Sequence, residues 1–76
     1  MILNIEIEVN GETFKYRDSR NEGITPSILR AYEKTTLERN TGIASHPKVH
    51  AESDSQGGWS GYVEAFRETA FFKASY

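Results

Sequence analysis

The first eighteen residues alternate between apolar and polar side chains, which is typical of a β-strand with one buried face. The alternation is interrupted by Asn10-Gly11, a dipeptide that favours a type I′ hairpin turn because both residues tolerate a positive φ. With the turn there, Ile7 lies opposite Phe14 and all the apolar residues share one side. A slip of one residue would reverse the faces. We therefore predict an antiparallel β-hairpin over residues 2–18.

A helix is predicted over residues 26–40. Thr25 is expected as its N-cap, and Pro26 suits the first helical position, where a missing N–H costs nothing. The helix should end near Asn40, with Gly42 as the residue after the C-cap. Residues at helical spacing form a narrow apolar stripe: Ile28, Leu29, Tyr32, Thr35 and Thr36. This stripe needs a partner surface, and we expect it to cover the dry face of the hairpin.

The segment 44–58 contains few apolar residues and is the hardest to interpret. Residues 48–53 are compatible with a short edge strand that turns Val49 and Ala51 inward. Residues 54–58 contain two glycines and are typical of a turn or loop. The alternative is an irregular segment, although one of this length is unusual in so small a domain.

The last eighteen residues carry most of the aromatic side chains, and two structures compete for them. A helix capped by Ser60 would align one apolar stripe, and this spacing fits better than a strand. As strands, the same residues would have their apolar side interrupted by Glu64 and Glu68, although aromatic content favours strand. We predict a C-terminal helix, with additional antiparallel strands as the alternative. The aromatic residues are Trp59, Tyr62, Phe66, Phe71, Phe72 and Tyr76.

These elements predict one α+β domain spanning residues 1–76: an N-terminal antiparallel hairpin packed by a central helix, followed by a C-terminal helix. A chain of 76 residues has no room for a second hydrophobic core. The expected core is Ile5, Ile7, Phe14, Tyr16, Ile28, Tyr32, Val63 and Phe66.

Composition narrows the classes of function. The formal net charge is −2 and the basic residues are scattered, so we expect no nucleic-acid partner. The absence of cysteine excludes disulfides and thiolate metal sites, and it favours a cytoplasmic location. No apolar run approaches the roughly 20 residues that span a bilayer, and the first residues do not resemble a signal peptide, so we expect no membrane association.

One cluster has metal-ligand chemistry. His46 and His50 are four residues apart, and Glu52 and Asp54 follow them. Pro47 disfavours a helix that would bring both imidazoles to one face. We therefore expect a solvated polar edge, no metal and no cofactor, with the two histidines as weak candidate ligands.

The aromatic residues are the stronger candidates for a binding site. Adjacent Phe71 and Phe72 cannot both face inward from one element, so one of them needs either a curved core or another chain to cover it. Trp59 lies among glycines, where it serves either as a lid over the core or as a contact for a partner. The predicted partner-binding residues are Trp59, Tyr62, Phe71, Phe72 and Tyr76.

No spacing typical of a catalytic site is present, so we do not expect an enzyme. The sequence favours a non-catalytic protein-binding module, such as a small adaptor or inhibitor protein of phage or accessory-gene type. Unpaired strand edges and exposed aromatics also favour a homodimer. The alternative is a protein that binds a small ligand or metal through residues 46–54.

Overall fold

A computed structural model describes residues 1–41 and 46–76, and its elements define an α+β fold with five strands and one helix. In chain order they are β1 (Leu3–Val9), β2 (Glu12–Asp18), α1 (Ile24–Glu38), β3 (Lys48–Ser53), β4 (Trp59–Ala65) and β5 (Glu68–Ser75). The α+β class is confirmed, whereas the C-terminal helix is wrong.

The N-terminal hairpin has the predicted turn and register. Asn10 and Gly11 have φ values of 53° and 78°, as a type I′ turn requires. Ile7 lies opposite Phe14, and Ile5 lies opposite Tyr16. Turn chemistry and alternation specify the same register here, which explains why the sequence alone was sufficient.

The central helix is confirmed, but it begins at Ile24 and its N-cap is Gly23, which has no side chain to make a capping hydrogen bond. The prediction of Thr25 as N-cap was wrong because the helix starts one residue before it. Pro26 still lies in the first turn, where its missing N–H removes no helical hydrogen bond. After the helix, Asn40 takes a left-handed conformation with φ 56°, while Gly42, expected in that role, lies outside the described residues.

Residues 59–75 form a β-hairpin instead of a helix. Its turn, Phe66-Arg67, contains no residue typical of turns, although Arg67 adopts a left-handed φ of 60°. This turn reverses the alternation, so Val63 faces inward before it and Ala70 after it. A single uninterrupted strand would put them on opposite faces. The strand alternative to the C-terminal helix is therefore the correct one.

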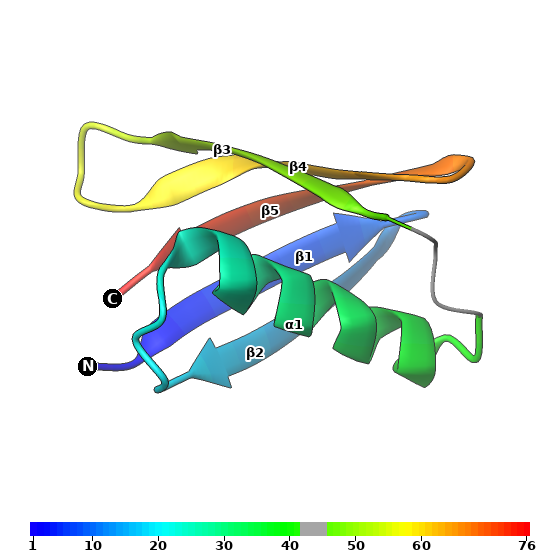
Figure 1. Ribbon diagram of the computed structural model, residues 1–76, viewed down its shortest axis with the longest axis horizontal. Helices are drawn as coiled ribbons and strands as arrows, with labels where there is room; N and C mark the ends of the chain where they lie inside the picture. The colour runs from blue at the N-terminus through cyan, green and yellow to red at the C-terminus, as the bar shows by residue number, and fades with distance from the viewer. Residues whose placement is uncertain (42–45) are drawn as a thin grey trace.

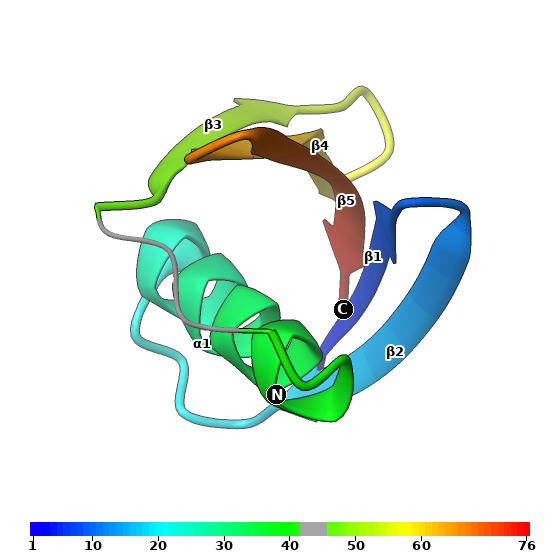
Figure 2. The same ribbon diagram turned by 90° about the vertical axis from the view of Figure 1, so that its right-hand side faces the viewer.

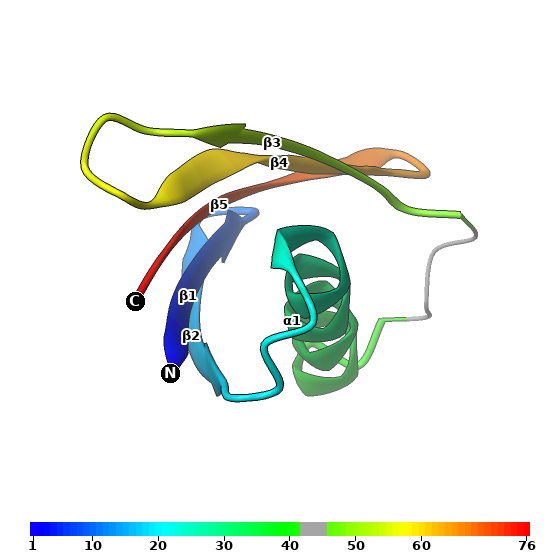
Figure 3. The same ribbon diagram turned by 60° about the vertical axis from the view of Figure 1, so that its left-hand side comes forward.

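The five strands form one antiparallel sheet in the order β2-β1-β5-β4-β3, so the N- and C-terminal strands lie side by side near its middle (Figure 1). The expected edge strand at residues 48–53 is present as β3. The helix packs on one face of the sheet, and the sheet curves around it (Figure 2). A third view shows that no other element covers the opposite face within the described chain (Figure 3).

The core lies between α1 and the sheet. Most of the expected core residues are there, but Phe14 and Tyr16 on the edge strand are only half-buried. Phe66 was wrongly predicted as core: it lies in the β4–β5 turn and is 73% exposed. Phe66 shares an apolar face with Tyr62 and Val63 only if this segment is helical, and the segment forms strands. The fully buried hydrophobic residues are Leu3, Ile5, Ile7, Val9, Ile28, Ala31, Tyr32, Val63, Ala70, Phe72 and Ala74.

A partly buried ion pair connects the C-terminal end of α1 to the start of β5. The Arg39 guanidinium donates hydrogen bonds to both carboxylate oxygens of Glu68, at 2.7 and 3.1 Å, and Tyr32 donates its hydroxyl to the same carboxylate. The Arg39 hydrogen bonds hold the pKa of Glu68 below its usual value. Burial, with the Glu68 hydrogen bond, raises the pKa of Tyr32 to about 12. The pair therefore fixes the helix against the sheet by charge-assisted hydrogen bonds.

At the other end of the helix, Arg30 joins α1 to the end of β2. Its guanidinium lies 2.7 Å from the carboxylate of Asp18 and 2.6 Å from that of Glu22. The backbone N–H of Arg20 and then Arg30 lower the pKa of Asp18.

Among the described residues, no helix is both long and apolar enough to cross a membrane.

Gly61 should be intolerant of any side chain. A Cβ there would lie 1.8 Å from the backbone oxygen of His50 on the neighbouring strand, and its φ is 155°. We expect Gly61→Ala to lower the free energy of unfolding by about 3 kcal/mol, measured by urea denaturation. Gly57→Ala is the control: φ is also positive but no atom lies within 4 Å, so the cost should be only about 1 kcal/mol. Equal losses would contradict the close strand approach at Gly61.

The Glu68–Arg39 pair should make stability depend on pH. The folded-state pKa of Glu68 is lowered from 4.5, so its contribution is complete above that pH and is lost as the pH falls through the folded-state value. We expect Glu68→Gln to cost about 1 to 3 kcal/mol at pH 7, and less at pH 3. Glu64→Gln, at a carboxylate that is 59% exposed, is the control and should change little. A pH-independent loss in Glu68→Gln would contradict the role of its charge.

Candidate functional site

The outer face of the sheet, opposite α1, is where polar and aromatic side chains gather. The strand registers align these side chains in rows across the sheet. One row joins Lys15, Glu6 and Lys73 on β2, β1 and β5. A second row joins Phe71, Tyr62 and His50 on β5, β4 and β3. Because strand neighbours lie about 5 Å apart, each row is a continuous surface.

The second row, which we name the ring row, consists of His50, Tyr62 and Phe71. The His50 and Tyr62 rings are stacked, with centroids 4.5 Å apart and an angle of 19°. The Tyr62 and Phe71 rings are tilted, with centroids 6.4 Å apart. Phe71 is 57% exposed and Tyr62 is 39% exposed. The three rings therefore form an apolar strip on a face that no other described element covers.

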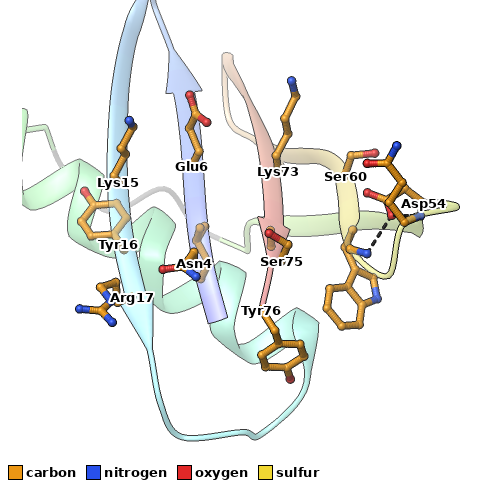
Figure 4. A pocket seen from close by; sticks show the side chains of 15 residues that line it. Asn4, Glu6, Lys15, Tyr16, Arg17, Asp54, Ser60, Lys73, Ser75 and Tyr76 are labelled. Atoms are coloured by element: carbon orange, nitrogen blue, oxygen red, sulfur yellow. Dashed lines mark hydrogen bonds between the residues drawn. The ribbon is translucent and has the colours of Figure 1, made fainter. Parts of the chain in front are cut away.

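An open hollow of about 920 Å³ lies beside this row on the outer face. Lys15 and Arg17 of β2 and Lys73 of β5 border it, and we name this region the basic hollow. Lys15, Glu6 and Lys73 stand side by side on neighbouring strands (Figure 4). None of the three basic residues belongs to any ion pair in the described part of the chain, whereas Arg30 and Arg39 are both paired. Their charges are available to a ligand.

Trp59 and Tyr76 both border the basic hollow, and their rings make an edge-to-face contact with centroids 5.8 Å apart. Figure 4 shows Tyr76 at its lower rim. The β3–β4 loop, which leads directly into Trp59, forms the rim on the side away from β2 (Figure 4). Asp54 holds this loop by accepting hydrogen bonds from the N–H groups of Gln56 and Gly58, both at 2.8 Å. Trp59 also packs against the core. It therefore covers the core and borders the hollow at the same time.

The predicted partner-binding residues do not lie on one surface. Tyr62 and Phe71 are on the outer face, and Trp59 and Tyr76 are at the end of the sheet. Phe72 is in the core and only 3% exposed, so it is not available to a partner. The adjacent phenylalanines are divided by strand alternation, which points one inward and the other outward. The aromatic tail is thus part of a central strand and cannot be removed without disrupting the core.

The candidate metal ligands are not brought together. His50 lies 3.2 Å from Glu64, which the sequence did not suggest, and Asp54 serves the loop. His46 is exposed before β3. Within residues 1–41 and 46–76, no group of three or more His, Asp or Glu side chains could hold a metal ion.

The basic hollow was missed by the sequence prediction. Lys15 and Arg17 alternate with apolar residues on β2, a pattern that indicates only a solvated face. Lys73 joins them because β5 pairs with β1, and this pairing was not predicted. His50 was considered only as a ligand, and its stacking on Tyr62 depends on the β3–β4 register.

No protein-family model matches this chain, and no curated protein or solved structure is significantly similar to it.

Proposed function

We propose that this protein is a non-catalytic protein-binding module, a small adaptor or inhibitor, whose partner contacts the ring row. The observation that carries the proposal is the exposure of Phe71 and Tyr62 together on an uncovered sheet face. Aromatic side chains contribute most to protein interfaces because they bury a large area and have few rotatable bonds. The strands hold these rings in position before binding, which lowers the entropic cost of association.

The surroundings of the ring row favour a protein over a nucleic acid. His50 and Tyr62 already stack on each other, so their facing ring surfaces are not available to a base. The carboxylates of Glu8 and Glu64 lie beside Phe71 and His50 on the same face. Negative charge around the rings would repel phosphate, whereas a protein partner can offer complementary polar groups at the rim.

Replacing Phe71 should weaken partner binding without unfolding the protein. We expect Phe71→Ser to weaken capture of the partner at least tenfold, as for a central interface aromatic, while lowering the free energy of unfolding by only about 1 kcal/mol through its lost cross-strand contact with Tyr62. The measurement is quantitative affinity purification from a lysate of the source organism, followed by titration of the captured protein against each variant.

Leu37→Ser is the matched control for this experiment. Leu37 is 70% exposed, so its replacement removes a similar apolar side chain, but it lies on α1 and away from the outer face. Capture should be unchanged in this variant. Loss of capture in Leu37→Ser together with full capture in Phe71→Ser would move the binding surface to the helix and contradict the proposal.

A second candidate function is binding of a small aromatic anion in the basic hollow. Three basic side chains that form no ion pair among the described residues border it together with the carboxylates of Glu6 and Asp54, and the Trp59–Tyr76 pair supplies aromatic surface. Arginine and lysine bind phosphate and carboxylate groups by charge-assisted hydrogen bonds. We propose this hollow as the ligand site instead of residues 46–54, because the candidate ligand side chains of that segment do not come together.

Phenyl phosphate is a suitable probe, with inorganic phosphate as the control for charge alone. In amide NMR titrations we expect the largest shifts at Lys15, Arg17 and Lys73, and tighter binding of phenyl phosphate than of phosphate. Arg17→Gln should weaken binding roughly three- to tenfold, the effect of about one charge-assisted hydrogen bond. Arg67→Gln, a substitution in the β4–β5 turn, is the control and should leave binding unchanged. If Arg17→Gln and Arg67→Gln bound phenyl phosphate with the same affinity, the basic hollow would be excluded as the site.

A further inference from the structure

Among the described residues, no strand pairs with the outer edge of β3. This strand is the last in the sheet order, and every residue in it except the half-buried Val49 is exposed. The ribbon shows no described segment beyond it (Figures 1 and 2). An unpaired edge offers a row of free N–H and C=O groups to another strand. The side chains of β3 indicate which strand it would accept.

The charges of β3 are arranged symmetrically around His50, with a positive side chain on one side of it and a negative side chain on the other. Lys48 lies two positions before His50 and Glu52 lies two positions after it, and all three project from the outer face. Val49 and Ala51 flank His50 on the opposite face. A strand with this arrangement is complementary to itself when it runs antiparallel to a copy.

We propose that β3 pairs with β3 of a second copy of this chain, antiparallel, about a two-fold axis at His50. This register puts Lys48 opposite Glu52 of the second copy, and each contact occurs twice by symmetry. Val49 lies opposite Ala51 of the second copy. Each pair joins residues of the same face, so both helices remain on one side and both outer faces on the other.

The opposite edge of the sheet does not have this property. On β2 the outer-face residues are Thr13, Lys15 and Arg17, so self-pairing about Lys15 or Tyr16 would bring like charges together. Basic side chains on an edge strand are a common protection against such pairing. The charges thus favour a closed dimer through β3 over contacts through β2.

The dimer goes beyond the protein-binding proposal and does not depend on it. Pairing of the two β3 strands joins the sheets into one sheet of twice five strands. His50 of each copy meets the other at the axis, so the two ring rows become one strip across the dimer. Because each copy contributes only one six-residue strand, we expect a weak, concentration-dependent dimer.

Charge reversal at the two complementary positions tests the pairing. In sedimentation equilibrium from about 10 μM to 1 mM, we expect the unmodified chain to approach twice its 8.6 kDa mass. Lys48→Glu and Glu52→Lys, measured separately, should each weaken association at least about tenfold, because like charges then lie opposite each other twice. Glu33→Lys, at an exposed position on α1 and away from both sheet edges, is the matched charge-reversal control and should leave association unchanged. Circular dichroism should show that each variant keeps its fold.

Mixing the two β3 variants separates pairing from damage to the strand. In a heterodimer of Lys48→Glu with Glu52→Lys, both contacts again join opposite charges, so the mixture should associate as strongly as the unmodified chain. A monomer at every concentration, or a mixture no stronger than the separate variants, would overturn the proposal. Assemblies larger than a dimer would indicate β2–β3 pairing and would also overturn it.

Discussion

The antiparallel pairing of β1 with β5 is the interaction on which the rest of the structure depends. It joins the first strand of the chain to the last, and it brings fully buried Ile7 opposite Phe72 in the centre of the core. Without it, the N-terminal hairpin would be an isolated two-stranded ribbon, which is marginally stable in water. With it, the hairpin and the β3–β4–β5 meander become one sheet large enough to cover the apolar stripe of α1. The loop-closure entropy of this long-range contact is offset by the core that it completes.

The pairing of β5 with its two neighbours, β1 and β4, determines what lies on the outer face. A single helix covers one side of the sheet, so the other side carries the residues that alternate with the core. Because core packing does not constrain these residues, they are available for binding. The β1–β5 register brings Lys73 next to Glu6 and Lys15, and the β4–β5 register brings Phe71 next to Tyr62. Both the basic hollow and the ring row are therefore products of strand order. Each combines residues that are far apart in the sequence, and neither exists within one element.

The parts of the fold that were predictable are those in which local signals agree. Asn10-Gly11 and the alternation around it specify the hairpin register, and helical spacing specifies α1. The C-terminal hairpin was missed because Phe66-Arg67 forms a tight turn without turn-forming residues, and because Glu68 interrupts the inward face of β5. That carboxylate is accommodated by hydrogen bonds from Arg39 and Tyr32 of the distant helix, tertiary contacts that no local pattern contains. Of the candidate site, Tyr62 and Phe71 were foreseen from composition, but their alignment with His50 required the sheet.

Aromatic contacts measured by NMR in the free protein test this account most directly. The structure predicts nuclear Overhauser effects between the ring protons of His50 and Tyr62, and between those of Tyr62 and Phe71. Both contacts require β3, β4 and β5 to pair in the described register. A C-terminal helix would instead bring Tyr62 close to Phe66 and leave Phe71 distant from Tyr62, because nine helical residues span about 13 Å. Observation of those helical contacts, with the ring-row contacts missing, would contradict both the sheet and the binding surface built on it.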